Sequence, residues 1–302
     1  MRPGAGMAAV SLASPAEPAK IEAGLRELER LGFAVAPPEA LHADGYFAGG
    51  EEERLRQLRR SLRNKDAAAV VAIRGGYGTS LLLDALAPSD FGEAKALIGY
   101  SDVTALQIFL WQSLGWVTFY GPMVASGFDA GAGNPGGYDR PSLVQALTET
   151  ESGWSVELLG IALEEGEAEG VLLGGCMTLI ESTLATPWEL STDGAILLLE
   201  DRAMKPYQVD RLLTHLKQAG KLSNVRGAVL GEFPECEPPE KGGPRVVDVC
   251  RRILGGLGVP LVWGAPIGHA ARPMLTLPLG VRARLRASGS GRLDILEPAV
   301  RA

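Results

Sequence analysis

The feature that most constrains the fold is a regular alternation of strand-like and helix-like segments through the first part of the chain. Short apolar runs alternate with segments whose leucines recur on one helical face. The expected strands are 7–12, 33–36, 67–73 and 94–98, and the expected helices are 19–31, 51–63, 79–86 and 102–114. This repeat predicts a mostly parallel sheet covered by helices on both faces.

A glycine-rich stretch at 126–141 interrupts this pattern, and we interpret it as the start of an interdomain connection. The alternation resumes near Glu169. The later expected strands are 195–200, 227–232 and 261–263. One helix is expected to end at Ala185 and another at 207–218, and 274–287 with 292–296 is expected as a closing hairpin. Because 302 residues exceed the usual size of one domain, we predict domains at 1–125 and 169–302 joined by 126–168.

The composition restricts the class of partner and the cellular compartment that we expect for this chain. A net charge of −7 argues against a nucleic-acid partner, so a small molecule is the better expectation. No apolar run reaches the roughly 18 residues of a membrane span. The three cysteines contain no C-x-x-C pair, which favours a reducing compartment and gives no zinc signature. The N-terminal apolar run is short and interrupted by Ser11, a poor signal peptide, so we expect a cytoplasmic protein.

Ser101 is the first candidate for chemistry. It follows an expected strand and opens an expected helix, a turn that lifts a side chain off the sheet edge among backbone N–H groups. The surrounding Gly-Tyr-Ser-Asp-Val has only the first glycine of G-x-S-x-G. The alternative is a helix N-cap, because serine followed by Asp102 stabilises a helix start.

A histidine-dependent mechanism has three candidates. His215 falls among the leucines of an amphipathic helix, where a structural role is expected, and His42 lies in a polar surface segment. His269 follows a strand in a glycine-flanked loop, a place where catalytic groups tend to lie. Glu200 ends a buried apolar run and needs a partner such as an imidazole. Its alternative is an acidic pair with Asp201 leading into the next helix.

The loop Arg-Gly-Gly-Tyr-Gly at 74–78 lacks both G-x-G-x-x-G and the Walker lysine. Its backbone N–H groups suit close approach to a ligand, and they could meet an anion or an oxyanion.

Several separated segments together resemble the LD-carboxypeptidase family, which includes the microcin-immunity peptidases. The similar segments, in order, are 74–78, 99–106, 120–123, 174–175, 186–188, 199–201, 206–207, 210–211, 268–269 and 277–280. They run over almost the whole chain. Each is a weak signal alone, but their shared order and spacing make the resemblance specific.

The resemblance implies an α/β fold with a Rossmann-like N-terminal domain, a smaller β-rich C-terminal domain, and an active site between them. It also implies a triad of Ser101, Glu200 and His269. The family's remaining site would fall on an oxyanion and substrate-binding set here, namely the N–H groups of Gly75, Gly76 and Asp102, with Trp188. A homodimer without metal or organic cofactor is expected on the same ground. One departure is Cys176, where the family pattern usually places asparagine.

The function implied by the resemblance is acyl transfer from a small peptide. The expected substrate is a murein tetrapeptide, cleaved between an L-configured diaminopimelate or lysine and a terminal D-amino acid. Two alternatives stay open at this point. One is a peptidase of the same family acting on a peptidyl-nucleotide or aminoacyl adduct, and the more distant one is a non-enzymatic, two-lobed binder of small ligands.

Overall fold

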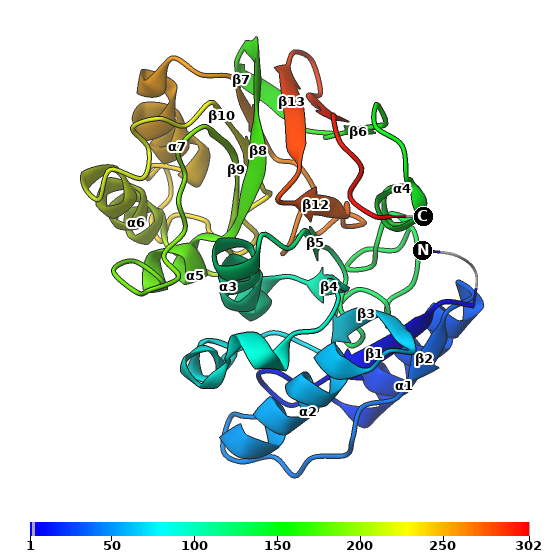
Figure 1. Ribbon diagram of the computed structural model, residues 1–302. Helices are drawn as coiled ribbons and strands as arrows, with labels where there is room; N and C mark the ends of the chain where they lie inside the picture. The colour runs from blue at the N-terminus through cyan, green and yellow to red at the C-terminus, as the bar shows by residue number, and fades with distance from the viewer. Residues whose placement is uncertain (2–3, 302) are drawn as a thin grey trace.

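Two sheets organise the computed structural model, which describes residue 1 and residues 4–301 (Figure 1). The first sheet has the order β12-β5-β4-β3-β1-β2. Its strands are β1 (Gly6–Val10), β2 (Ala34–Ala36), β3 (Ala67–Ala72), β4 (Ala96–Gly99), β5 (Thr118–Tyr120) and β12 (Leu277–Leu279). Strands β1 to β5 pair in parallel, whereas β12 runs antiparallel to β5.

The helices of the first part follow the strands in alternation. They are α1 (Pro18–Arg30), α2 (Glu51–Arg63), the 3₁₀ helices η1 (Ser80–Ala85), η2 (Pro88–Asp90) and η3 (Ser101–Val103), and α3 (Thr104–Leu114). Helix α2 begins with three glutamates and carries Arg60 and Arg63 in its last turn, charges that complement its dipole. Its face with Leu55, Leu58 and Leu62 is buried against the core.

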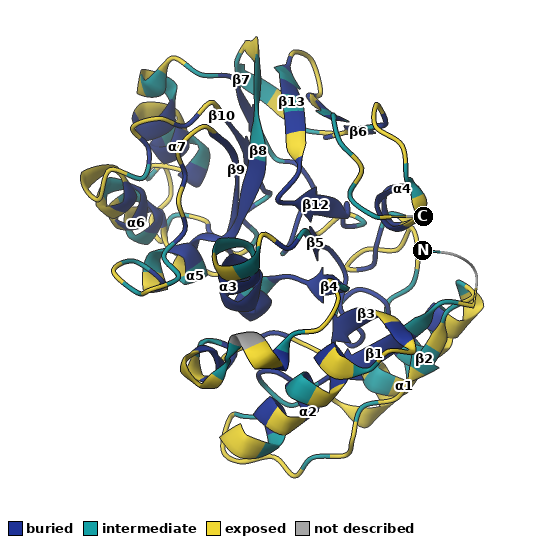
Figure 2. Cartoon of the chain, viewed as in Figure 1, coloured by how far each residue is buried: buried dark blue, intermediate teal, exposed yellow. Residues whose placement is uncertain are grey.

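The second sheet has the order β6-β14-β13-β8-β9-β10-β11-β7. Its strands are β6 (Ser155–Glu157), β7 (Ile161–Glu164), β8 (Gly166–Cys176), β9 (Ala195–Glu200), β10 (Gly227–Leu230), β11 (Leu261–Trp263), β13 (Arg282–Ala287) and β14 (Arg292–Ile295). The four strands β8 to β11 pair in parallel, and the other strands pair in antiparallel. Figure 2 shows that β9 and β10 are buried throughout, whereas β8 is buried only in its second half, from Leu172 to Cys176.

Helices α5 (Met177–Ser182), α6 (Pro206–Gln218) and α7 (Val246–Leu254) lie on one side of this sheet, with η4 (Gly255–Leu257) after α7 (Figure 1). Helix α6 buries Val209, Leu212, Leu213 and Leu216, the apolar stripe that its sequence predicts. The predicted α/β class, a parallel N-terminal sheet followed by a β-rich part, is confirmed.

The expected closing hairpin is wrong in one respect. The segment 274–287 is not one strand, because it is interrupted at Gly280, which has φ of +92°. A Cβ at this glycine would lie 2.7 Å from the Trp111 ring. Before the break, β12 joins the first sheet, and after it β13 joins the second. Residues 126–168, expected as a connection, contain helix α4 (Arg140–Thr148) and strands β6 and β7 of the second sheet.

Candidate active site

Ser101 stands at a strained turn between β4 and α3. Its φ is +62°, in the left-handed region that a residue with a Cβ rarely adopts. Such strain persists where the surrounding structure enforces it, and it gathers at functional sites. Helix α3 starts at Thr104 without a side-chain cap, so the capping alternative for Ser101 is not supported. The turn instead presents a hydroxyl at the carboxyl end of a parallel strand.

Glu200 is the last residue of β9, and its side chain is fully buried. Two glycines leave room for its side chain. A Cβ on Gly268 would lie 2.4 Å from the Glu200 Cδ, and one on Gly231 would lie 2.6 Å from the Glu200 Cβ. Burying a carboxylate is costly unless hydrogen-bond donors surround it. Glu200 therefore needs hydrogen-bonding partners inside the protein.

One such partner is His269. Its backbone amide donates to Glu200 Oε2 at 2.9 Å, and its Nδ1 lies 2.8 Å from the same oxygen. Because a carboxylate only accepts, the bond assigns the proton to Nδ1 and leaves Nε2 as the free base. The histidine side chain is 12% exposed, so it is held by the protein yet open to a reactant.

The aromatic ring of Tyr100 connects this pair to the nucleophile turn. Tyr100 directly precedes Ser101, and its ring meets the His269 ring edge-on at 5.1 Å between centroids. Within residues 4–301, no hydrogen bond joins the Ser101 hydroxyl to His269. Catalytic hydrogen bonds are often loose without substrate and tighten in the complex.

The glycine loop at 74–78 lies against the same turn. A Cβ on Gly75 would be 2.9 Å from the Ser101 Cβ and 3.1 Å from its Oγ, so only glycine fits at this contact. Gly76, with φ of +114°, packs still more closely on Ser14, where a Cβ would lie 2.3 Å from the hydroxyl oxygen. The sequence-predicted loop and nucleophile are thus brought together.

Two buried charges hold that loop in place. Asp102 accepts a hydrogen bond from the Thr79 amide at 2.8 Å, and Arg54 donates to the Gly78 carbonyl at 2.9 Å. Burial raises the pKa of Asp102, and the hydrogen bonds from Thr79 partly oppose this. Asp102 therefore holds the glycine loop through its side chain, while the oxyanion role of its backbone N–H stays a prediction. The sequence did not indicate either Arg54 or this role of the Asp102 side chain.

A second residue that sequence reasoning missed is Tyr120, at the end of β5. Its hydroxyl donates to Glu200 Oε1 at 2.6 Å and accepts from the Ser101 amide at 3.3 Å. A Cβ on Gly175 would lie 2.7 Å from the Thr104 side chain and 3.0 Å from the Tyr120 ring, and one on Gly174 would lie 2.0 Å from the Leu198 carbonyl oxygen, so both positions before Cys176 require glycine. The signals for Tyr120 were its position at the end of an apolar segment, immediately before Gly-Pro, and its place in the family-like segment 120–123, to which no role was assigned.

Cys176 lies next to Glu200, because the ends of β8 and β9 are paired at these two residues. Burial raises the pKa of the Cys176 thiol well above its ordinary value, and the charges of Glu200 and Asp201 raise it further. The neutral thiol is therefore a packing group beside the carboxylate. Its backbone N–H donates to the Thr104 hydroxyl at 3.2 Å.

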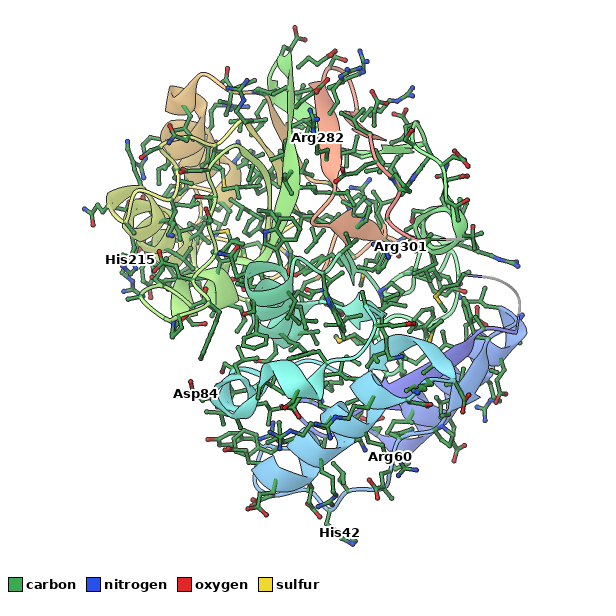
Figure 3. All side chains as sticks on the ribbon, in the orientation of Figure 1. His42, Arg60, Asp84, His215, Arg282 and Arg301 are labelled. Atoms are coloured by element: carbon green, nitrogen blue, oxygen red, sulfur yellow. The ribbon has the colours of Figure 1, made fainter. Side chains whose placement is uncertain are left out.

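The remaining candidates lie elsewhere. Figure 3 shows His42 and His215 at the periphery of the molecule, and His215 Nδ1 pairs with Glu181 at 2.8 Å. Trp188 is partly buried and meets the Phe109 ring of α3 at 5.8 Å between centroids. This contact accounts for the packing of Trp188 against α3. Its role in substrate binding stays a prediction.

Neither a metal-ligand cluster nor a membrane-spanning helix is found in residue 1 and residues 4–301. Among those residues, no three histidine, cysteine or acidic side chains come together as metal ligands. No helix within 4–301 has both the length and the apolar character needed to cross a bilayer.

A strained serine at a strand end, with a buried carboxylate–histidine pair beside it, is the arrangement found in serine hydrolases, and the fold and site place this chain in that class. Family models narrow this class. The LD-carboxypeptidase N-terminal domain matches residues 7–121, and the LD-carboxypeptidase C-terminal domain matches residues 169–285. The chain belongs to the LD-carboxypeptidase family of peptidases.

Relatives agree with this membership. The chain is 35% identical to a probable murein peptide carboxypeptidase of Bacillus subtilis, over 92% of this chain and 88% of that one. It shares 30% identity and a TM-score of 0.86 with the crystal structure of a muramoyltetrapeptide carboxypeptidase from Oxalobacter formigenes, covering 98% and 100% of the two chains. It is also 27% identical to the microcin C7 self-immunity protein of Escherichia coli, over 86% and 83% of the chains.

Proposed function

We propose that this protein is a serine carboxypeptidase that removes a terminal D-amino acid from murein tetrapeptides. The bond cut would be the amide between an L-configured diaminopimelate or lysine and that terminal residue. The observation that carries the proposal is the buried Glu200–His269 pair, with Nδ1 and Oε2 2.8 Å apart beside the strained Ser101 turn. The names of two relatives, a murein peptide carboxypeptidase and a muramoyltetrapeptide carboxypeptidase, support the substrate class.

The reaction begins with general-base catalysis. His269 Nε2 takes the proton of the Ser101 hydroxyl as Oγ attacks the amide carbonyl, and Glu200 stabilises the resulting imidazolium without taking its proton. The imidazolium then protonates the leaving amine. Water, activated by the same imidazole, hydrolyses the ester on Ser101 and completes the cycle.

The oxyanion of the tetrahedral intermediate needs N–H donors close to Ser101. The backbone groups of Gly75, Gly76 and Asp102 are the candidates. Their support is proximity, because a Cβ on Gly75 would lie 3.4 Å from the Asp102 nitrogen and 3.1 Å from the Ser101 Oγ. Asp102 and Arg54, buried behind the loop, would keep the donors fixed while charge develops on the substrate oxygen.

Trp188 is proposed to contact the peptide, and a cytoplasmic homodimer that acts on small muropeptides is expected from the family resemblance. The excess of acidic side chains, 36 against 29 basic ones, fits a small-molecule substrate better than nucleic acid.

The second candidate is cleavage of an aminoacyl-nucleotide adduct. It is favoured by the 27% identity to the microcin C7 self-immunity protein. A structure of that protein in complex with aspartyl sulfamoyl adenosine superimposes with a TM-score of 0.87 at 23% identity, a likeness of fold.

Hydrolysis of the two candidate substrates, measured side by side, distinguishes the two proposed functions. Purified protein is incubated with a murein tetrapeptide ending in D-Ala and, separately, with aspartyl sulfamoyl adenosine, and the released amino acid is quantified. The Ser101→Ala variant is the control in both assays. We expect Ser101-dependent release of D-Ala and little release of aspartate. Faster release of aspartate would replace the murein assignment with the nucleotide one.

A further inference from the structure

Tyr120 links the nucleophile to the acid of the triad through one hydroxyl group. The residue is fully buried at the end of β5. Its hydroxyl donates to Glu200 Oε1 at 2.6 Å and accepts from the backbone N–H of Ser101 at 3.3 Å. A single phenol therefore contacts the strained backbone of one catalytic residue and the carboxylate of another.

The two oxygens of Glu200 have different partners. Oε2 accepts both hydrogen bonds from His269, and Oε1 accepts from Tyr120. Glu200 ends a strand of the second sheet, whereas Tyr120 ends a strand of the first. The Tyr120–Glu200 bond thus fixes the position of Glu200, and with it His269, relative to the Ser101 turn that follows β4 of the first sheet. Without it, one oxygen of a buried carboxylate would lose its donor.

We propose that Tyr120 is a positioning residue of the catalytic centre, which sets the strength of the Glu200–His269 pair and the geometry of the Ser101 turn. This inference rests on the proposed serine mechanism and adds a fourth side chain to it. Tyr120 does not touch the reacting atoms and acts through Glu200 and the Ser101 backbone.

The protonation state of the phenol suits this role. Burial raises the pKa of Tyr120 well above its ordinary value, and the charges of Glu200 and Cys176 raise it further. The hydroxyl therefore keeps its proton and remains a donor to the carboxylate across the working pH range. A phenolate in the same place would repel Glu200 and leave Oε1 without a donor.

The test removes only the hydroxyl, in Tyr120→Phe. Loss of a hydrogen bond to a buried charged group predicts a fall in kcat/KM of about ten- to a hundredfold. A carboxylate with one donor fewer attracts the imidazolium more strongly, so the acidic limb of the pH–rate profile moves to higher pH. A purely structural loss would leave that limb in place.

Other titratable groups that act on Glu200 are known from the structure: Tyr100, Cys176, Asp201, Cys236 and His269. Burial raises the pKa of Tyr100 to about 12 and raises those of Cys176 and Cys236, so these groups stay neutral at acidic and neutral pH. Asp201, whose pKa burial also raises, titrates in both wild type and variant. The shift between the two profiles therefore reports on the loss of the Tyr120 hydroxyl.

Tyr138→Phe is a matched control. Tyr138 is also fully buried, and its hydroxyl donates to Glu27 at 2.7 Å, so the same group is removed from the same kind of bond outside the site. Its kcat/KM and its pH–rate profile should equal those of wild type. Equal losses in both tyrosine variants would overturn the proposal, as would a wild-type profile for Tyr120→Phe.

A second variant, expected to shift the acidic limb of the pH–rate profile in the opposite direction, tests the proposal even if Tyr120→Phe folds poorly. Replacement of Tyr120 by 3,5-difluorotyrosine strengthens the donated bond and nearly preserves the shape of the ring. The acidic limb should then move to lower pH. An unchanged limb, or one that moves to higher pH, contradicts the role.

Labelling of Ser101 by a fluorophosphonate separates this inference from the substrate assignment. The labelling rate and its pH dependence measure activation of the serine without any peptide. If wild type is labelled but releases no D-Ala, the substrate proposal fails and the Tyr120 variants are still compared by labelling. If Tyr120→Phe is labelled as fast as wild type across the pH range, the positioning role is wrong whatever the substrate.

Discussion

His269 reaches Glu200 twice, through its backbone N–H at 2.9 Å and through Nδ1 at 2.8 Å, and both bonds end on the same carboxylate oxygen. The hydrogen bond from the backbone N–H fixes the position of the His269 backbone, and the hydrogen bond at Nδ1 fixes the tautomer of the ring. A histidine held in this way presents Nε2 in one orientation, which general-base catalysis needs.

Glu200→Gln should therefore impair turnover severely while leaving the protein folded. The amide cannot stabilise an imidazolium, and its NH₂ group can donate to Nδ1 and favour the wrong tautomer. We expect a loss of roughly a thousandfold or more in kcat, by analogy with the loss of the acid in other triads. Steady-state release of D-Ala measures it. A loss below tenfold would mean that the carboxylate is structural.

Ser101→Ala and His269→Ala should each lower turnover by several powers of ten with little change in the thermal transition. The matched control is His215→Ala, which removes an exposed histidine that also pairs with a glutamate, Glu181. The control should keep wild-type turnover. Near-normal activity in either of the first two variants would remove that residue from the mechanism.

Ser101→Gly should be more stable than Ser101→Ala, although both are inactive. Serine and alanine have a Cβ that strains the backbone at φ of +62°, whereas glycine adopts this conformation freely. The expected difference in the free energy of unfolding is about 1 kcal/mol. Urea unfolding of the two variants measures it directly, and an alanine variant at least as stable as the glycine variant would contradict the strain.

Gly268→Ala should damage the site, whereas Gly264→Ala should not. Both glycines have positive φ, +59° and +77°, so alanine costs about 1–2 kcal/mol of stability at either position. Only at Gly268 would the new Cβ meet Glu200, 2.4 Å from its Cδ, and nothing lies within 4 Å at Gly264. We expect D-Ala release to fall at least tenfold in the first variant alone. Similar activity in the two variants would show that Glu200 tolerates displacement.

The sequence predicted the elements that depend on local periodicity and missed those that depend on distant contacts. The strand ending at Glu200 and the helix at 207–218 follow from their apolar patterns, and the structure reproduces both. The departure of β12 from the expected hairpin is a pairing with the distant strand β5, which no local pattern carries. Helix α7 (Val246–Leu254) was likewise not anticipated.

The same distinction holds at the candidate site. Ser101, Glu200 and His269 stand at strand ends and in a glycine-flanked loop, so their positions in the sequence marked them as candidates. Tyr120 was marked only as part of the family-like segment 120–123, and its role could not be predicted, because that role arises only when the ends of β5 and β9 meet. Arg54 was hidden for a similar reason. It lies in a charged helix, where a cation normally faces solvent, yet its side chain is fully buried beneath the glycine loop.

The most direct test of the central claim compares two synthetic tetrapeptides that differ only in the chirality of the terminal alanine. A pocket shaped for a D residue would drive the L methyl group into its wall or leave a carboxylate unpaired, at about 1–3 kcal/mol for each lost contact. Two such losses correspond to discrimination on the order of a hundredfold or more. Chromatography of the released amino acid should therefore show D-Ala from its peptide and little L-Ala from the epimer. Equal rates, or preference for the L terminus, would contradict the assignment as an LD-carboxypeptidase acting on murein peptides.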